Sequence, residues 1–164
     1  MGIPLRDISG ALPDFSGIER RFDIHLNDGT HLVIDDYAHN PHKMASLMET
    51  VKNISPRICY IFQPHGFGPT RLMKQGYIDT FIQHLRREDH LILLPIYYAG
   101  GTSQKDIASE DLLDEIQKAG KSAEVLPDRK QLFDRVQEWD HYVVFGARDD
   151  SLGDFARDIA ERLK

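Results

Sequence analysis

Residues 31–51 read HLVIDDYAHNPHKMASLMETV. Further strand-like and helix-like segments alternate after this stretch, without an internal sequence repeat. A strand is expected over residues 31–35, which are apolar at 32–34, and it leads into a polar loop. Asn40-Pro41 then predicts the start of a helix, because Asn caps helices and Pro is favoured at the first helical position. Apolar side chains follow at helical spacing, namely Met44, Leu47, Met48 and Val51. The stretch therefore predicts a strand, a loop and a helix in succession.

The residues before this stretch predict a hairpin that pairs with it. Phe22, Ile24 and Leu26 alternate with other residues, as on a strand with one buried face. Asp28-Gly29 follows, and Gly takes the positive φ that tight turns need. Residues 1–20 are rich in Gly, Pro and Ser and are interpreted as a lead-in.

Strand-like and helix-like segments alternate in the rest of the chain. The predicted strands are 58–62, 91–96, 123–126 and 141–145, and the predicted helices are 71–87, 109–119, 129–136 and 151–163. Thr70 is expected to cap the first of these helices and Gly120 to end the second. Such alternation is typical of a mostly parallel sheet covered on both faces. We therefore expect a single α/β domain over residues 1–164, a Rossmann-like three-layer fold with an N-terminal β-hairpin.

The bulk composition is that of an ordinary globular protein and excludes several classes. Of 164 residues, 41% are hydrophobic and 28% are charged, and the formal net charge is −6. No basic run stands out, so we expect no nucleic-acid partner, and no apolar stretch reaches the roughly 18 residues of a membrane span. The N-terminus lacks a secretory signal pattern and the one cysteine allows no internal disulfide, so a cytoplasmic protein is expected.

Polar, aromatic and glycine residues gather in the loops that follow the predicted strands. In a parallel sheet these loops share the edge at which ligands bind. Four segments occupy this edge, at residues 35–40, 63–68, 97–101 and 146–150. We therefore expect a functional site there, whatever its ligand.

The densest of these clusters, residues 35–42, is open to three interpretations. Its carboxylates and imidazoles could contact a substrate or nucleotide, or they could cap and support the following helix. A metal site would use Asp36, His39, His42 and His65, but the break at Pro41 makes a shared helical face for the first two histidines doubtful. Residues 64–71 leave a similar choice between an anion site at a helix N-terminus and a simple capped turn.

Several other features of the sequence give no support for catalytic or ligand-binding residues. The chain contains neither a Walker A sequence (GxxxxGK[ST]) nor a GxSxG nucleophile motif. Cys59 lies within an apolar run and is expected to be buried and inert. From the residues alone, Arg20-Arg21 is interpreted as a solvated basic pair. Core packing is expected for the aromatic residues at core-like spacing, namely Tyr77, Phe81, Phe133, Trp139 and Phe155.

Five segments, in order, resemble motifs of the Mur ligase family, especially those of UDP-N-acetylmuramate–L-alanine ligases. Residues 33–41, VIDDYAHNP, are similar to Asp-Asp-Tyr-Gly-His-His-Pro, and residues 17–22, GIERRF, to Gly-x-x-Arg-Arg-Phe. Residues 62–71, FQPHGFGPTR, are similar to Phe-Gln-Pro-His-Arg-Phe/Tyr-Thr-Arg-Thr-Arg. Residues 97–100, YYAG, and Gly146-Ala147 resemble Tyr-x-Ala-Gly and Gly-Ala-Gly. The resemblance covers about residues 8–164 and is to the C-terminal domain of these enzymes.

The resemblance implies one part of an ATP-dependent carboxylate–amine ligase of peptidoglycan synthesis. In this family ATP converts the muramoyl carboxylate to an acyl phosphate, which the amino group of an amino acid attacks, and the protein contributes mainly positioning and charge stabilisation. The implied substrates are UDP-N-acetylmuramate and a small amino acid. ATP and Mg²⁺ are the implied cofactors of the full enzyme.

The same resemblance implies that two domains of the full enzyme lie outside this chain, the UDP-binding N-terminal domain and the central ATPase domain with its P-loop. We therefore expect an excised domain or part of a split protein, which works with the central ATPase domain in cis or in trans. Alone it is expected to be inactive and to hold no cofactor tightly.

The resemblance also implies roles for individual residues. Arg21, with Arg20 as the second choice, would reach the nucleotide phosphates, and Asp36 would reach the ribose. The residues implied on the amino-acid side are Tyr37, His39, His65 and, as the remaining basic candidate for the incoming carboxylate, Arg71. No metal ligand is implied in this domain.

The chain departs from the family motifs at positions that bear on specificity. Gly66 and Pro69 stand where the alanine ligases have Arg, and Asn40, Lys43 and Arg148 replace a His, a Glu and a Gly. The loss of both arginines removes two guanidinium groups that could bind a carboxylate, so the identity of the amino acid stays open. A divergent relative, such as the murein-peptide recycling ligase, is one alternative. Others are a stand-alone binding or regulatory module without catalysis and a metal-dependent hydrolase.

Overall fold

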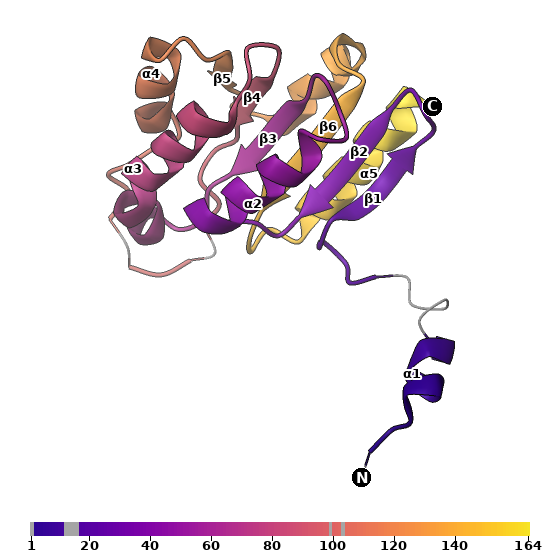
Figure 1. Ribbon diagram of the computed structural model, residues 1–164. Coiled ribbons are helices and arrows are strands. Elements are labelled where there is room, and N and C mark those ends of the chain that lie inside the picture. Colours follow the sequence, from indigo (N-terminus) through magenta and orange to yellow (C-terminus); the bar gives the residue numbers. More distant parts are fainter. Residues whose placement is uncertain (1, 12–16, 99, 103) are drawn as a thin grey trace.

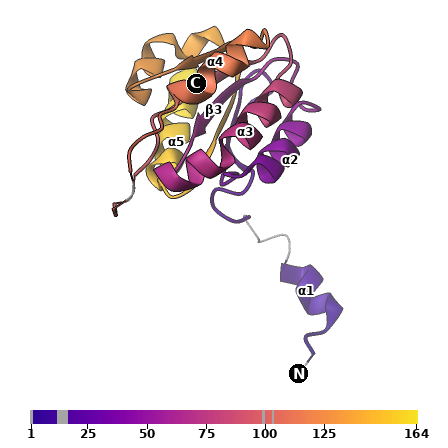
Figure 2. The ribbon, with the colours of Figure 1, turned by 90° about the vertical axis from the view of Figure 1, so that its left-hand side faces the viewer.

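A computed structural model describes residues 2–11, 17–98, 100–102 and 104–164. Ala99, which belongs to the YYAG segment, lies outside the described residues. The first helix, α1 (Leu5–Ala11), lies apart from the sheet and its covering helices, as Figures 1 and 2 show from two sides. Helix α1 is absent from the sequence-based prediction, which treats residues 1–20 as a lead-in.

Strands β1 (Asp23–Asn27) and β2 (Leu32–Asp36) form the predicted antiparallel hairpin. Asp28 organises its turn, because Oδ1 accepts hydrogen bonds from the N–H groups of Thr30 at 2.8 Å and His31 at 2.6 Å. These bonds favour the charged carboxylate and lower the pKa of Asp28 to about 2. The charged turn therefore helps to fix the pairing of the two strands.

Six strands form one sheet in the order β1-β2-β6-β3-β4-β5. The remaining strands are β3 (Cys59–Gln63), β4 (His90–Leu93), β5 (Ala123–Val125) and β6 (His141–Gly146). All neighbours from β2 to β5 across the sheet are parallel, and only β1 runs in the opposite direction. The mostly parallel sheet with an N-terminal hairpin is confirmed, and the carboxyl ends of β2, β6 and β3 are adjacent.

Helices cover both faces of this sheet, as predicted, which gives the three layers of a Rossmann-like fold. One face carries α2 (Pro41–Val51), α3 (Phe67–His84) and α4 (Glu110–Lys118). The other carries α5 (Ser151–Leu163) and the 3₁₀ helix η2 (Arg129–Glu138). Figure 1 shows α2 and α3 in front of the sheet and α5 behind it. None of the described helices is both long enough and apolar enough to cross a membrane.

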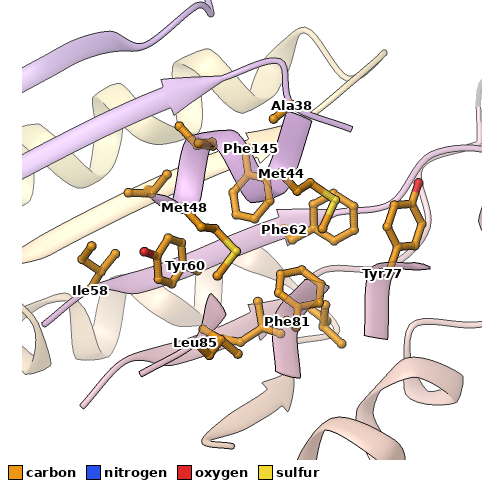
Figure 3. Close-up of a cluster of buried hydrophobic side chains, with 14 of the residues drawn as sticks. Ala38, Met44, Met48, Ile58, Tyr60, Phe62, Tyr77, Phe81, Leu85 and Phe145 are labelled. Carbon is orange, nitrogen blue, oxygen red and sulfur yellow. The ribbon is translucent and has the colours of Figure 1, made fainter. Parts of the chain in front are cut away.

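The two-residue alternation along the strands divides the core into two clusters. Ile34 and Phe62 belong to the cluster under α2 and α3. Figure 3 shows Phe62 packed there with Tyr77, Phe81 and their neighbours. Val33 and Cys59 point the other way, into a cluster with Trp139, Phe155 and the apolar face of α5. Phe133 packs against this second cluster. The predictions that Cys59 is buried and that the five aromatic side chains are core residues are confirmed.

Helix α3 begins at Phe67, earlier than the predicted residue 71, and the expected cap at Thr70 is wrong. The N-cap position belongs to Gly66, which has a φ of 67°, and the Thr70 N–H donates to the Gly66 carbonyl at 3.0 Å. Pro69 does not delay the helix, because the first turn has no intrahelical partner for its N–H groups anyway. The N-terminus of α3 therefore follows His65 directly, at the edge of the sheet.

Candidate functional site

The loops that follow the parallel strands meet at the carboxyl edge of the sheet, where the sequence predicts a site. Asp36 pairs with Phe145 across β2 and β6, and Gln63 pairs with Gly146 across β3 and β6. Beyond the strands, His65 forms a parallel bridge with Tyr97. The edge is therefore continuous from β2 to the segment after β4.

Arg20 lies at the centre of this edge and is only 6% exposed, so its interpretation as a solvated residue is wrong. Its guanidinium donates from Nη2 to the carbonyl of Gly146 at 2.8 Å, from Nη1 to the carbonyl of Asp149 at 3.0 Å, and from Nε to Oδ2 of Asp35 at 2.9 Å. It also lies 5.3 Å from the centre of the Tyr37 ring. All of these contacts are internal, so Arg20 joins the start of β1 to the loop after β6.

Asp36 shapes the turn that leaves β2. Its Oδ2 accepts a hydrogen bond from the N–H of Phe22 at 2.8 Å, and its Oδ1 accepts one from the N–H of Ala38 at 2.7 Å. Each carboxylate oxygen has a second lone pair, and the side chain is partly exposed. Asp36 can therefore hold the loop and still accept a hydrogen bond from the hydroxyl of a ligand.

Tyr37, His39 and His65 lie in a row, with edge-to-face ring contacts at 5.5 Å and 5.4 Å between centroids. Nδ1 of His39 is 2.8 Å from the carbonyl oxygen of Tyr37. Because a carbonyl only accepts, Nδ1 carries a hydrogen there, and Nε2 is the free acceptor of the neutral ring. The hydroxyl of Tyr37 accepts from the N–H of Arg148 at 3.3 Å. The structure thus brings together three of the four residues predicted for the amino-acid side, and the fourth, Arg71, is not part of this row.

The imidazole of His65 is poorly solvated. Within the described ranges its buried Nδ1 has no hydrogen-bond partner. Burial lowers the pKa of His65 below 6.5, and the nearby positive charge of Arg148 lowers it further. At pH 7 the ring is therefore neutral and can accept a hydrogen bond from an amine or hydroxyl of a ligand.

Arg71, the predicted carboxylate ligand, is engaged elsewhere. It lies in the first turns of α3, where its exposed guanidinium donates to the carbonyl of Gln104 at 3.3 Å and forms an ion pair with Asp106. This pairing lowers the pKa of Asp106. A ligand carboxylate that used Arg71 would have to compete with Asp106, which belongs to the segment between β4 and α4.

Arg21 and Asp36, the two predicted nucleotide contacts, line the same hollow between the start of β1 and helix α2. The hollow has a volume of about 420 Å³, and His42 and Lys43 from the first turn of α2 also line it. Arg21 is exposed, unlike Arg20 next to it. The two adjacent arginines therefore differ in their surroundings, because Arg20 is buried in the protein and Arg21 is accessible.

A second hollow, of about 270 Å³, lies at the same edge beside β3 and β4 and was not predicted from the sequence. It is lined by Gln63, Tyr97, Arg129 and Asp149 among others. Oε1 of Gln63 is buried and has no partner within the described part of the chain. Nη1 of Arg129 reaches Oδ2 of Asp149 at 3.3 Å. Arg129 and Asp149 are far apart in sequence and share no motif, so only the fold reveals their proximity.

The metal interpretation gains no support from the geometry. Within residues 2–11, 17–98, 100–102 and 104–164, no three His, Cys, Asp or Glu side chains are grouped so that they could hold a metal ion. His39 and His65 are neighbours, but the oxygens of Asp36 face the backbone N–H groups of Phe22 and Ala38.

The sequence matches the family described as "Mur ligase, glutamate ligase domain" over residues 20–148. A UDP-N-acetylmuramate–L-alanine ligase from Fusobacterium nucleatum is 32% identical over 177 aligned residues, which cover 99% of this chain and 36% of that protein. The crystal structure of UDP-N-acetylmuramate-alanine ligase from Thermotoga maritima is similar with a TM-score of 0.70 and 26% identity, over 98% of this chain and 34% of that one.

The fold extends to a more distant solved structure, a murein peptide ligase from Psychrobacter arcticus. The TM-score is 0.59 at 20% identity, over 99% of this chain and 32% of that one. At this identity the likeness concerns the fold alone. In all three comparisons this chain spans about a third of the relative's length.

Proposed function

The chain belongs to the Mur ligase family, and from this premise we propose that it is the domain that contacts the nucleotide and the amino acid in an ATP-dependent ligase. The enzyme would join UDP-N-acetylmuramate to an amino acid through an amide bond, in peptidoglycan synthesis. The relatives of this chain named for that ligation, from Fusobacterium nucleatum and Thermotoga maritima, support the assignment. The metal-dependent hydrolase is not favoured, because the family membership and the side-chain geometry both point elsewhere.

One observation carries the proposal. Arg21 and Asp36 line one hollow at the carboxyl edge, and Tyr37 lies between that hollow and the row it forms with His39 and His65. Cationic and hydrogen-bonding groups for a nucleotide would thus lie next to imidazoles for an amine. Adjacent sites of this kind suit a reaction in which an amine attacks a carboxylate that ATP has activated.

In the proposed ligase Arg21 contacts phosphate, and Asp36 accepts a hydrogen bond from the ribose. His39 Nε2 and the neutral His65 ring accept hydrogen bonds from the amino group, which holds that group in position for attack. Arg71 is the proposed partner of the incoming carboxylate, and binding would release it from Asp106. The amino acid itself is a small one, with Tyr37 at the side of its subsite.

ATP and Mg²⁺ are the proposed cofactors of the complete enzyme. The accessible Arg21 fits a phosphate group, whereas the described residues offer no cluster of carboxylates or imidazoles for a metal ion. The sequence also lacks a Walker A loop. Both Mg²⁺ and most of the triphosphate contacts would therefore come from the central ATPase domain, which is the proposed partner of this one in cis or in trans.

A chimera tests the function directly. This chain would replace the matching third of the Fusobacterium nucleatum ligase, and phosphate release would be measured with UDP-N-acetylmuramate, ATP, Mg²⁺ and each of the small amino acids. Amino-acid-dependent phosphate release above the level of the truncated enzyme is expected. In the active chimera, Arg71→Ala should raise the KM for the amino acid with little change in the KM for ATP, and an unchanged amino-acid KM would refute the role of Arg71.

The alternative is a stand-alone binding or regulatory module that has the fold but no catalytic partner. It predicts a chimera that folds and binds the other substrates but releases no phosphate with any amino acid. The isolated chain is expected to be inactive under either proposal, so only the chimera distinguishes them.

A further inference from the structure

The second hollow, beside β3 and β4, lies over the opposite face of the sheet from the hollow between β1 and α2. Leu94 lines the second hollow and belongs to the core cluster under α5, whereas Leu47 lines the other hollow and belongs to the cluster under α2 and α3. Among the described lining residues of the second hollow, none belongs to the row of Tyr37, His39 and His65. It is therefore separate from the residues proposed for the nucleotide and the amino acid.

The order of the strands explains why a hollow opens at this place. Helices α3 and α4 follow β3 and β4 on one face, and η2 and α5 follow β5 and β6 on the other. Because β6 and β5 flank the β3-β4 pair in the sheet, the connections diverge on both sides of that pair. Ligands of open α/β sheets bind in the crevices that form at such points. The hollow lies in such a crevice, since Asp128 from the loop after β5 and Asp149 from the loop after β6 both line it.

Gln63, the last residue of β3, brings an unpaired acceptor to this hollow. The residue is only 8% exposed, and its Nε2 donates to the carbonyl of Pro95 at 3.3 Å. Because that carbonyl only accepts, the NH₂ group faces it, and Oε1 is the atom left without a partner in the described part of the chain. A buried acceptor without a donor is unfavourable, so a ligand that donates to it gains affinity. The last torsion of a glutamine side chain is broad, so a small rotation can direct Oε1 to such a donor.

The charge that stays unneutralised in this hollow is negative. The guanidinium of Arg129 donates to Oδ2 of Asp149 at 3.3 Å and to Oγ of Ser151 at 2.7 Å, so Arg129 and Asp149 neutralise each other. Within the described ranges Asp128 forms no ion pair. Its Oδ1 accepts a hydrogen bond from the N–H of Lys130 at 2.9 Å, which leaves Oδ2 free. The groups available to a ligand are therefore an exposed carboxylate and a buried carbonyl oxygen, and both are acceptors.

Much of the remaining wall is apolar or aromatic. Pro95, Ile96 and Pro127 line the hollow, together with Tyr97. Proline rings are rigid, so this part of the wall keeps its shape without a ligand. Such a wall suits a short alkyl chain, and the volume of about 270 Å³ is sufficient for one.

We propose that this hollow binds a small molecule with a primary ammonium group on a short alkyl chain. An ammonium group has three donors and no acceptor, which matches a site whose free groups are acceptors. The ammonium donates to Oε1 of Gln63 and is attracted by the carboxylate of Asp128, while the alkyl chain packs on the proline rings. The site goes beyond the proposed ligase reaction, because it takes neither the nucleotide nor the amino acid of that reaction.

Amide NMR spectra of the ¹⁵N-labelled 164-residue chain test the proposal. The probes n-butylammonium, n-butanol and butyrate have similar alkyl chains but differ in charge, and they would be titrated separately at neutral pH and low ionic strength. Butylammonium should shift the amide signals of Gln63, Tyr97 and Asp128 with a Kd that is roughly millimolar, because so small a ligand makes few contacts. Butanol should bind more weakly, and butyrate should leave these signals in place. Added salt should weaken the binding of butylammonium.

Two substitutions test the two acceptors separately. Gln63→Met keeps an unbranched side chain of similar length without the carbonyl oxygen, and it should weaken butylammonium binding about tenfold. Asp128→Asn removes the charge but can still cap η2, and it should weaken binding about threefold. Asp134→Asn is the matched control for the charge, because Asp134 is exposed on η2 and is not among the described lining residues. It should change the Kd by less than about 1.5-fold.

Thermal unfolding separates lost binding from lost structure. The Tm of Gln63→Met should lie within about 4 °C of that of the wild type, because the substitution removes an unpaired buried acceptor along with one long hydrogen bond. Weaker binding by Gln63→Met and Asp128→Asn, each with a Tm near that of the wild type, supports the proposal. If Gln63→Met unfolds at a much lower temperature, the comparison of Asp128→Asn with Asp134→Asn decides the matter by itself.

Four results would overturn the proposal. The first is an absence of amide shifts well above millimolar butylammonium, which would mean that the hollow holds only water. The second is that n-butanol or butyrate binds as tightly as butylammonium. The others are that a folded Gln63→Met binds like the wild type, or that Asp128→Asn binds as well as Asp134→Asn. None of these results depends on whether the chimera is an active ligase, so the two proposals can fail separately.

Discussion

Arg20 and Asp35 form a buried ion pair, in which Nε of Arg20 lies 2.9 Å from Oδ2 of Asp35. Burial raises the pKa of the Asp35 carboxyl, and the hydrogen bond and charge of Arg20 oppose that rise. Arg20 also has a φ of 57°, a left-handed conformation that is uncommon for a residue with a side chain. The pair therefore holds a strained backbone in place, immediately before the residue that lines the hollow, Arg21.

Replacement of Arg20 by Ala should cost far more stability than the same change at Arg21. Arg20→Ala leaves Asp35 buried without its partner and frees the carbonyls of Gly146 and Asp149, so we expect a loss of about 3–5 kcal/mol in the free energy of unfolding. Arg21→Ala removes an exposed side chain and should change the free energy of unfolding by less than about 0.5 kcal/mol. Urea unfolding of both variants measures the difference.

The pH dependence of Arg20→Ala provides a control on this interpretation. Without the guanidinium, the pKa of Asp35 should rise further, so the folded variant would bind a proton that the unfolded chain releases. Its stability deficit should then shrink as the pH falls toward the pKa of Asp35. Similar losses in Arg20→Ala and Arg21→Ala, or a deficit that does not change with pH, would contradict the structural role of the pair.

His65 should make the protein less stable in weak acid. Its pKa is below 6.5 in the folded state, so between that pKa and 6.5 the unfolded chain binds more protons than the folded one. The contribution of the neutral His65 to the stability of the folded state is therefore complete above pH 6.5, and it is lost as the pH falls through the pKa of His65 in the folded protein. Urea unfolding between about pH 7.5 and about pH 5.5 should show a shallower loss in His65→Gln than in the wild type. An NMR titration that placed the imidazole pKa at or above 6.5 would refute this.

Two glycines of helix α3 should respond to alanine in opposite directions. A Cβ at Gly76 would lie 2.7 Å from Cγ of Pro41, and the rigid proline ring at the start of α2 cannot turn away. Gly76→Ala should therefore force α2 and α3 apart and cost about 1–3 kcal/mol. A Cβ at Gly68 would meet nothing within 4 Å, so Gly68→Ala should stabilise the helix by up to about 1 kcal/mol. Urea unfolding measures both, and a stabilised Gly76→Ala would contradict the packing argument.

Cys59 should be unreactive in the folded protein. Its thiol is fully buried in β3, and burial raises the pKa of the thiol well above its usual value, so little reactive thiolate is present. Reaction with a chromogenic disulfide should be slow in buffer and fast in urea. Its rate in buffer should increase in destabilised variants such as Gly76→Ala, because the thiol reacts only when the structure around β3 opens and a destabilised variant opens more often. Rapid labelling of the native wild type would contradict the burial of this strand.

The fold could be predicted because its signals are local. The apolar strands, the Asn40-Pro41 helix start and the alternation of strands with helices each depend on neighbouring residues, and the sheet has the predicted character. Local signals failed at helix boundaries. Thr70 was a plausible cap by residue type, but the positive φ of Gly66 starts the helix earlier. The helix α1 has only seven residues, too few to give a clear periodic signal.

The positions of the candidate site residues could be predicted where these residues follow strand ends, and could not be predicted where segments distant in sequence meet. Residue order alone placed Asp36, Tyr37, His39 and His65 at one edge, because parallel strands bring their carboxyl ends together. The buried role of Arg20 depends on carbonyls of residues 146 and 149, and the second hollow depends on Arg129 and Asp149. Contacts between residues this far apart cannot be recognised from the spacing of neighbouring residues in the sequence.

The chain's order of apolar and polar residues was thus sufficient to establish the layers, the sheet and the edge at which ligands would bind, since these follow from backbone geometry and from burial of apolar side chains. Contacts between segments far apart in sequence decided the rest. They determine which of the two adjacent arginines turns inward, which cations stay unpaired, and which histidine is shielded from solvent. Side-chain electrostatics depends on distance and burial in three dimensions, and neither quantity is encoded in the spacing of residues along the chain.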